Sequence, residues 1–308
     1  GAAFIFVYLV CIAIIGFPVL ISEILIGRTT QKNPVGAFQA LSNSKFWVSV
    51  GFLGVLAGFL ILSFYSVIGG WTIGYVVETL RGSLSNFQNP EEAGLLFGNL
   101  VGNVGWGIGF HTIFFGLTMF IVIRGVQGGI ERASKIMMPI LLSILVILII
   151  RGVTLEGADA GLAFLWVPDW SKITGQSILI ALGHAFFTLS LGMGAMLTYG
   201  SYMSKRDNVI TSAAQIVFLD TLIAIMAGVA IFTAVFASGL NPAAGPGLIF
   251  QTLPAVFSTM PGGVYFSFLF FLLLAIAALT SAISLLEVVV AYFVDEKGWN
   301  RKGAVLIF

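Results

Sequence analysis

Asp220 is the ionisable residue of this 308-residue chain that most needs an explanation. It lies in the apolar run IVFLDTLIAIM, and no basic residue stands within one helical turn of it. A carboxylate at the centre of a bilayer costs roughly 2.5–3.5 kcal/mol, so it requires a partner from another helix or a bound ion. We interpret Asp220 as a group that couples an ion or a proton, with a protonated structural Asp as the alternative.

Oxygen-bearing side chains also gather toward the C-terminal end of the chain. Residues that recur at three- and four-residue steps share one face of a helix, and here they are Ala277, Thr280, Ser281, Ser284, Leu285 and Glu287. Hydroxyls beside an available carbonyl suit a small hard cation, which prefers oxygen ligands. Such hydroxyls in membrane helices more often bond the helix's own carbonyls, and that alternative stays open.

A glycine-containing stretch from Gly183 to Met203 reads GHAFFTLSLGMGAMLTYGSYM. Two glycines lie in its centre, Ser190–Gly194, and each costs about 0.5–1 kcal/mol relative to Ala in a helix. A break there would free backbone groups that lipid cannot satisfy, so they must face protein, ion or ligand. A broken membrane helix is typical of a transporter site. Close helix packing through small residues is the alternative.

The other polar residues at depth have plainer interpretations. Glu23 and Glu287 lie near the inner ends of predicted spans, where snorkelling lowers the cost of a charge, so we expect structural roles. His184 can titrate near neutral pH, although a lone His is more often packed and neutral. The sequence contains no recognisable nucleophile–base pair, His/Cys/carboxylate cluster, phosphate loop or nucleic-acid patch. It therefore predicts neither an enzyme nor a nucleic-acid partner.

The elements that position these residues are predicted to be membrane helices. The chain is 58% hydrophobic and 9% charged, against about 25% charged in ordinary soluble domains. It is therefore an all-α polytopic membrane protein by composition. The predicted spans are 2–27, 46–80, 102–123, 136–150, 173–204, 209–238 and 264–294. Pro and Gly interrupt 239–263, which we expect to form an extracellular lid.

The basic residues predict the orientation. Eleven of the 14 Lys and Arg residues fall on one side when the spans alternate, so the positive-inside rule places residue 1 outside. The chain opens with GAAF and ends in an apolar run. We therefore expect residues 1–308 to be a single transporter domain that is truncated at both ends.

Several stretches together resemble the neurotransmitter:sodium symporter family, and its bacterial amino-acid transporters in particular. They read GAAF, PVLISEILIGR, SFYSVIGGW, IRGVQGGIERASKIMMP, FLWVPDW, FFTLSLGMGAMLTYGSYM, TLPAVF and ALTSAISL, in family order. The resemblance implies an inverted-repeat transporter fold with a discontinuous helix. The seven spans would be family helices two to eight, followed by the start of nine.

The resemblance also implies two sodium sites. Thr188 and Asp220 would contribute to the first site, beside the substrate carboxylate. The carbonyl of Ala277 and the hydroxyls of Thr280 and Ser281 would form the second. Because Asp220 itself supplies a negative charge, we expect no chloride requirement.

Substrate and gate residues follow from the same resemblance. Tyr65 would bond the substrate carboxylate and, with Phe187, close the pocket toward the outside. Asp295 resembles an inner-gate acid. Gly129 and Pro139 match a spacing associated with helix unwinding, which would admit water from inside. The side-chain pocket would be lined by Ile61, Ser190, Met193, Ser281 and Leu285.

The predicted function is sodium-coupled symport of hydrophobic or aromatic amino acids by alternating access, across the plasma membrane. Its partners would be the amino-acid substrate, sodium ions and the lipid bilayer. One alternative is proton coupling through Asp220, Glu287 or His184. An ion channel and a noncatalytic membrane subunit are further alternatives, because polar residues can also line a pore.

Overall fold

Long apolar runs dominate the architecture. The computed structural model describes residues 1–42, 44–85, 87, 89–240, 242 and 245–308. Every regular element within these residues is helical. Six of the described helices are long and apolar enough to cross a membrane. Their bounds are Ala2–Thr30, Lys45–Leu80, Val104–Ile123, Val126–Val153, Val209–Ala237 and Gly263–Lys297.

Two of these spans contain a π-helical turn. The first consists of α1 (Ala2–Cys11), η1 (Ile12–Gly16) and α2 (Phe17–Thr30). The span predicted at 136–150 begins with η2 (Val126–Glu131) and continues as α7 (Arg132–Val153). It therefore extends into the basic connector, as expected, because fifteen residues are too short to cross a bilayer. The other four spans are α4 (Lys45–Leu80), α6 (Val104–Ile123), α11 (Val209–Ala237) and α13 (Gly263–Lys297).

Shorter helices connect or complete the spans. They are α3 (Pro34–Leu41), α5 (Pro90–Gly102), α8 (Ala158–Trp166), η3 (Trp170–Lys172), α9 (Gly175–Thr188), α10 (Ala195–Tyr202), η4 (Leu248–Thr252), α12 (Leu253–Thr259) and α14 (Arg301–Ile307). Side-chain caps fix where several begin. The Asn33 side chain accepts from the first N–H groups of α3, and Thr174 and Ser177 form a capping box at α9.

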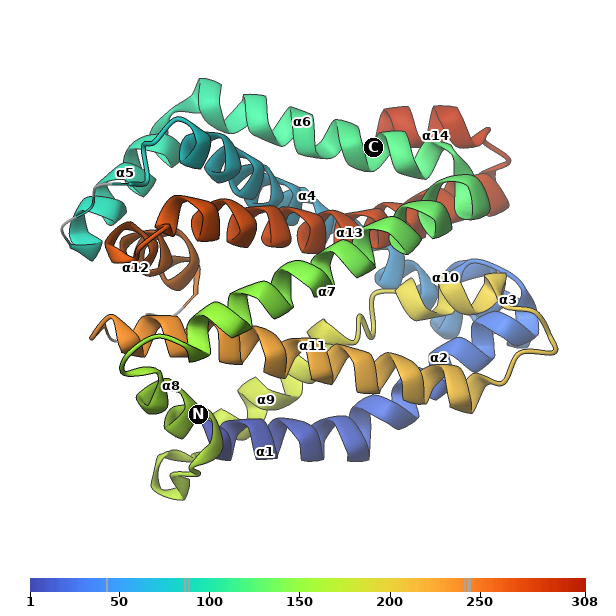
Figure 1. Cartoon of the computed structure of the whole chain (residues 1–308). Helices are drawn as coiled ribbons and strands as arrows, with labels where there is room; N and C mark the ends of the chain where they lie inside the picture. The colour runs from blue at the N-terminus through green and yellow to red at the C-terminus, as the bar shows by residue number, and fades with distance from the viewer. Residues whose placement is uncertain (43, 86, 88, 241, 243–244) are drawn as a thin grey trace.

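The long helices lie side by side, and α13 runs through the interior of the bundle (Figure 1). α13 contacts α4, α6, α7 and the short helix α10. α10 also packs on α2, while α9 packs on α1. The two halves of the predicted fifth span, α9 and α10, therefore pack on the two ends of the first span.

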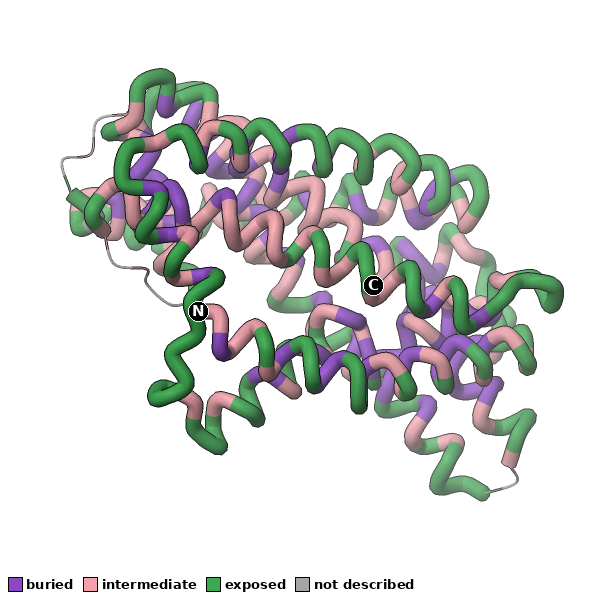
Figure 2. The backbone as a smooth tube through the Cα atoms, turned by 60° about the horizontal axis from the view of Figure 1, so that its bottom comes forward, coloured by how far each residue is buried: buried purple, intermediate pink, exposed green. Residues whose placement is uncertain are grey.

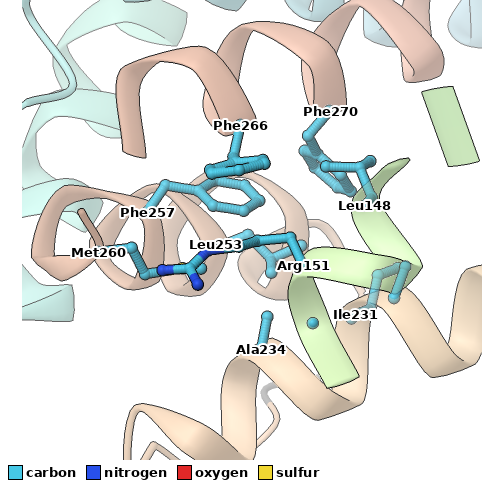
Figure 3. Close-up of a pocket in the computed structure, with 11 residues that line it drawn as sticks. Leu148, Arg151, Ile231, Ala234, Leu253, Phe257, Met260, Phe266 and Phe270 are labelled. Atoms are coloured by element: carbon cyan, nitrogen blue, oxygen red, sulfur yellow. The ribbon is translucent and has the colours of Figure 1, made fainter. Parts of the chain in front are cut away.

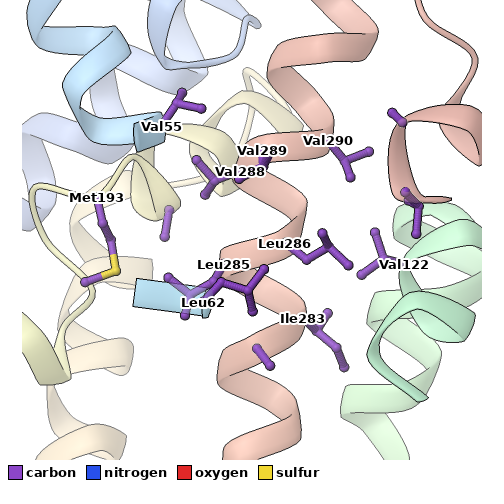
Figure 4. Packing of buried hydrophobic residues seen from close by; sticks show 14 of the residues in the cluster. Val55, Leu62, Val122, Met193, Ile283, Leu285, Leu286, Val288, Val289 and Val290 are labelled. Atoms are coloured by element: carbon purple, nitrogen blue, oxygen red, sulfur yellow. The ribbon is translucent and has the colours of Figure 1, made fainter. Parts of the chain in front are cut away.

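The C-terminal half of α13 is the most deeply buried part of the bundle. Its Leu286, Val288 and Val290 are fully buried and pack with Val122 of α6 (Figure 4). The outer surfaces of the bundle are exposed (Figure 2), and large apolar side chains such as Ile14 contribute to them. Apolar side chains on the outside of a bundle of this composition face lipid.

Two glycines explain how α10 lies so close to α2, because a Cβ atom at Gly27 of α2 would come within 2.0 Å of the Leu197 carbonyl oxygen of α10. A Cβ atom at Gly200 would come within 2.6 Å of the Ile24 carbonyl oxygen. Lipid tails are as apolar as the side chains, so burial of apolar surface does little to bring helices together in a membrane. Their association depends instead on close packing of small residues. The close-packing alternative for the glycines of this span therefore applies to Gly200.

The predicted lid, 239–263, is only partly described, because residues 241, 243 and 244 lie outside the described residues. Its described part forms η4 and α12, which are too short to cross a membrane. Figure 3 shows the Arg151 side chain extending from α7 toward Met260, at the end of α12. The Arg151 guanidinium lies 5.5 Å from the centre of the Phe266 ring, so a cation–π contact from α7 packs beside this segment.

Candidate functional site

The helix predicted to break does break. Residues 189–194 separate α9 from α10 and have no helical conformation. Ser190 has a φ of 56°, a left-handed backbone that is strained for a residue with a side chain. Gly192 and Gly194 follow with φ values of 77° and 76°, which glycine adopts without strain. Strain of this kind at a predicted substrate residue is typical of functional sites.

A few hydrogen bonds hold the break in place. The N–H of Leu191 donates to the Phe186 carbonyl (2.9 Å), a reverse turn that closes α9. The N–H of Gly192 donates to Glu23 Oε1 (2.7 Å), so α2 supports the break from the side. Among the described residues, no donor reaches the backbone carbonyls of 188–193. These carbonyls are therefore free to bind a cation or an ammonium group.

Asp220 lies beside the break and has partners on two other helices, as expected. Thr188 Oγ1, at the end of α9, donates to Asp220 Oδ1 (2.8 Å). The Tyr8 hydroxyl of α1 donates to Asp220 Oδ2 over a longer distance of 3.4 Å. The His184 ring packs against the Tyr8 ring, with centroids 5.1 Å apart. We call Tyr8, Thr188 and Asp220 the acidic patch.

The second predicted cation site lies on α13 alone. Thr280 Oγ1 donates to the Ala277 carbonyl (2.8 Å), and Ser281 Oγ lies 3.3 Å from the same oxygen. Three oxygen atoms thus converge on an unbroken helix, and we call Ala277, Thr280 and Ser281 the hydroxyl patch. The alternative left open by the sequence, in which these hydroxyls bond a carbonyl of their own helix, is present, so the hydroxyls have their hydrogen bonds within α13 in this structure.

A cavity of about 290 Å³, partly open to solvent, joins the break to α13. All seven predicted substrate residues line it, together with Thr188 and Asp220. The structure adds three lining residues that the predicted substrate and cation sets do not contain. These are His184, Ala195 and Ser284. Phe187 is 50% exposed and lines the cavity.

The predicted gate residues are dispersed around this cavity. Tyr65 and Phe187 line it. Asp295 lies near the C-terminal end of α13, where it accepts a 3.4 Å hydrogen bond from Asn33 Nδ2. Gly129 belongs to the π-helical turn η2 and Pro139 to the helix interior of α7, so the turn between them is wound in this structure. Its unwinding stays a prediction.

The expected snorkelling of Glu23 and Glu287 was wrong, because both carboxylates are buried. Glu23 is 9% exposed, and its Oε2 has no hydrogen-bond partner among the described residues. Glu287 is fully buried and forms a two-armed ion pair with Arg301 of α14. It also accepts from the Tyr202 hydroxyl (2.6 Å). These partners replace the water that snorkelling would have reached.

The chemistry of the two patches suits an alkali cation better than a transition metal. Both patches supply only oxygen atoms, from a carboxylate, hydroxyls and carbonyls. Within the described part of the chain, no three His, Cys, Asp or Glu side chains gather closely enough to hold a metal ion. Hard oxygen donors with a single negative charge match a small monovalent cation.

A profile of the sodium:neurotransmitter symporter family matches residues 1–90 and 99–307. The chain belongs to this family. The predicted resemblance is therefore confirmed, and so is the predicted class, because the family consists of sodium-coupled transporters and not of enzymes. With its apolar spans, membership makes the chain part of a multi-pass membrane protein.

Two bacterial proteins with similar sequences are uncharacterised sodium-dependent transporters. The sodium-dependent transporter YhdH of Bacillus subtilis is 44% identical over 291 residues, which is 94% of this chain and 64% of the relative. A sodium-dependent transporter of Haemophilus influenzae is 38% identical over 316 residues, covering all of this chain and 69% of that protein. The chain thus spans about two thirds of the length of these relatives.

A solved structure in the family has the same fold. The crystal structure of MhsT in complex with L-phenylalanine matches this chain with a TM-score of 0.91 and 47% sequence identity. The match covers all of this chain and 70% of that chain. The predicted discontinuous-helix transporter fold is thereby confirmed.

Proposed function

We propose that the protein is a sodium-coupled symporter of amino acids, with hydrophobic or aromatic side chains preferred. The observation that carries this proposal is the single cavity in which the broken helix, the acidic patch and the face of α13 meet. A free amino acid has a carboxylate, an ammonium group and a side chain. The cavity offers hydroxyls and a cation site to the carboxylate. It offers free backbone carbonyls to the ammonium group and apolar walls to the side chain.

Charge explains why sodium and substrate would bind together. Asp220 and the substrate carboxylate are both anionic, so they repel each other unless a cation lies between them. A sodium ion held by Asp220 and Thr188 would turn this repulsion into attraction. The coupling is reciprocal, because sodium must raise substrate affinity by the same factor as substrate raises sodium affinity. The hydroxyl patch would bind a second sodium ion.

An alternating-access mechanism would give the remaining predicted residues roles as gates. Tyr65 and Phe187 would close over the substrate from outside, with the lid 239–263 above them. Asp295 and the segment between Gly129 and Pro139 would control the inner side. We place the protein in the plasma membrane with residue 1 outside, on the basic residues of its loops.

Uptake into vesicles tests the proposal. We expect the reconstituted full-length protein to accumulate radiolabelled phenylalanine or leucine when an inward sodium gradient is imposed, and not when potassium replaces sodium. Replacement of chloride by gluconate should leave uptake unchanged, because Asp220 supplies the charge. Uptake driven by a pH gradient without sodium would select proton coupling instead. Unsaturable ion flux without amino-acid dependence would select a channel.

A further inference from the structure

Ser284 is a polar residue of the cavity that neither cation patch uses. It lies three residues beyond Ser281 on α13, about 4.5 Å further toward the inner end of the helix. Around it the cavity is lined by apolar side chains, among them Ile61, Met193 and Leu285. Ser284 Oγ is thus a polar atom in a cavity that these apolar side chains also line, and a few placed polar groups among apolar ones are how binding sites fix the orientation of a ligand.

The neighbours of Ser284 Oγ determine which hydrogen bonds it donates and which it accepts. Ser284 Oγ lies 3.2 Å from the Thr280 carbonyl, which can only accept. The Tyr199 hydroxyl lies 2.8 Å from Ser284 Oγ, and among the described residues it has no other hydrogen-bond partner. The hydroxyl protons of Ser284 and Tyr199 both find an acceptor in only one arrangement. Ser284 donates to Thr280, and Tyr199 donates to Ser284.

This arrangement leaves the cavity with an acceptor and no donor at that point. A hydroxyl has one proton and two lone pairs, and here the proton and one lone pair are engaged. The second lone pair of Ser284 Oγ is free, and Ser284 lines the cavity. A ligand group that donates a hydrogen bond can therefore bind to it without disturbing these bonds, whereas a carbonyl or carboxylate group of a ligand side chain would first have to displace the Thr280 carbonyl.

We propose that Ser284 is a specificity-determining residue that favours amino acids whose side chain carries an N–H or O–H donor on an aromatic ring. The proposal rests on the proposed function, since it assumes that an amino-acid side chain occupies the apolar end of the cavity. An indole or a phenol meets both demands of this region. Its ring packs on the apolar walls, and its one donor reaches the free lone pair of Ser284.

A pair of matched ligands tests the proposal on the full-length protein. Tryptophan and its benzothienyl analogue have nearly the same shape, but sulfur replaces the ring N–H in the analogue. We expect tryptophan to compete with radiolabelled leucine roughly 2- to 10-fold more strongly than the analogue, the effect of one neutral hydrogen bond. In Ser284→Ala, the ratio of the two inhibition constants should fall to about 1.

Ser49→Ala is the matched control, because Ser49 makes the same kind of bond to the carbonyl four residues earlier but is exposed on α4. Its inhibition ratio should equal that of the unmodified protein. The proposal is overturned by a ratio near 1 in the unmodified protein, or by an unchanged ratio in Ser284→Ala. It is also overturned if Ser190→Ala alone abolishes the ratio, because the donor would then bind at the helix break. Absence of sodium-dependent binding for every amino acid would instead reject the proposed function itself.

Discussion

The acidic patch and the hydroxyl patch are built in opposite ways. The acidic patch draws on α1, α9 and α11, and two hydroxyls already point at its carboxylate. The hydroxyl patch lies on α13 alone, is neutral, and has its hydroxyls satisfied by one carbonyl of the same helix. The first patch concentrates negative charge through tertiary structure, whereas the second only presents oxygen atoms.

This difference predicts which of the two patches binds a cation with higher affinity. A formal charge near the ion contributes several kcal/mol at the effective dielectric of a protein, and a neutral hydroxyl contributes far less. The hydroxyl patch must also exchange its internal hydrogen bonds for contacts with the ion. We therefore expect the ion at the acidic patch to be retained while the ion at the hydroxyl patch is released.

The largest expected effect comes from removing the charge of the acidic patch. Asp220→Asn should raise the sodium concentration for half-maximal amino-acid binding on the order of 100-fold or more, because the only formal charge of the patch is lost. Binding of radiolabelled amino acid against sodium concentration measures this. Asp169→Asn, in an exposed loop, is the control. An unchanged sodium dependence in Asp220→Asn would remove the acidic patch from the mechanism.

The break itself offers a matched pair of substitutions. Gly192→Ala and Gly194→Ala each force a side chain into left-handed backbone, which costs roughly 1–2 kcal/mol. Only at Gly194 does a Cβ atom meet a neighbour closely, at 2.8 Å from Pro34 Cγ. Gly194→Ala should therefore lower the melting temperature further, by overpacking of about 1–3 kcal/mol. Equal losses in thermal unfolding would show that the break relaxes freely around Pro34.

A smaller effect is expected at the hydroxyl patch. Thr280→Ala removes one neutral ligand, and the half-saturating sodium concentration should rise about 10-fold, well below the effect of Asp220→Asn. Thr112→Ala is the control, because Thr112 makes a similar bond to its own helix but is exposed on α6. If Thr280→Ala equalled or exceeded Asp220→Asn, the proposed ranking of the two patches would be reversed.

The smallest effect should follow from Tyr8→Phe. The hydrogen bond from Tyr8 to Asp220 is long, at 3.4 Å, so it contributes little to placing the carboxylate. We expect a change of about 2- to 3-fold in sodium affinity, measured in the same binding assay. A loss as large as that of Asp220→Asn would mean that Tyr8 holds the carboxylate in its binding position.

The sequence was sufficient to predict the features that arise from local chemistry. The helix break at 189–194 follows from poor helix propensity, and the need of Asp220 for tertiary partners follows from its depth in an apolar run. The residues around the cavity came from the family resemblance, and the structure gathers them in one place. Their roles in binding stay predictions.

Contacts between distant segments could not be predicted in this way. Glu23 bonds to Gly192, which is 169 residues away, and only the packing of α2 against α10 brings them together. Glu287 likewise pairs with Arg301, which lies beyond the end of α13. Hydropathy placed both acids near a membrane boundary, but it contains no information about which polar group faces which. The sequence feature that could have indicated a buried partner for Glu23 is its position as an acid in an otherwise apolar run.

The six-residue interruption between α9 and α10 has a mechanical consequence. Helical hydrogen bonds transmit rotation along a rod, and few of them cross residues 189–194. The first half, α9, packs on α1, and the second half, α10, packs on α2 and α13. In the proposed alternating-access mechanism, the interruption would act as a joint about which each half pivots with its own neighbours, so that one face of the membrane opens while the other stays shut.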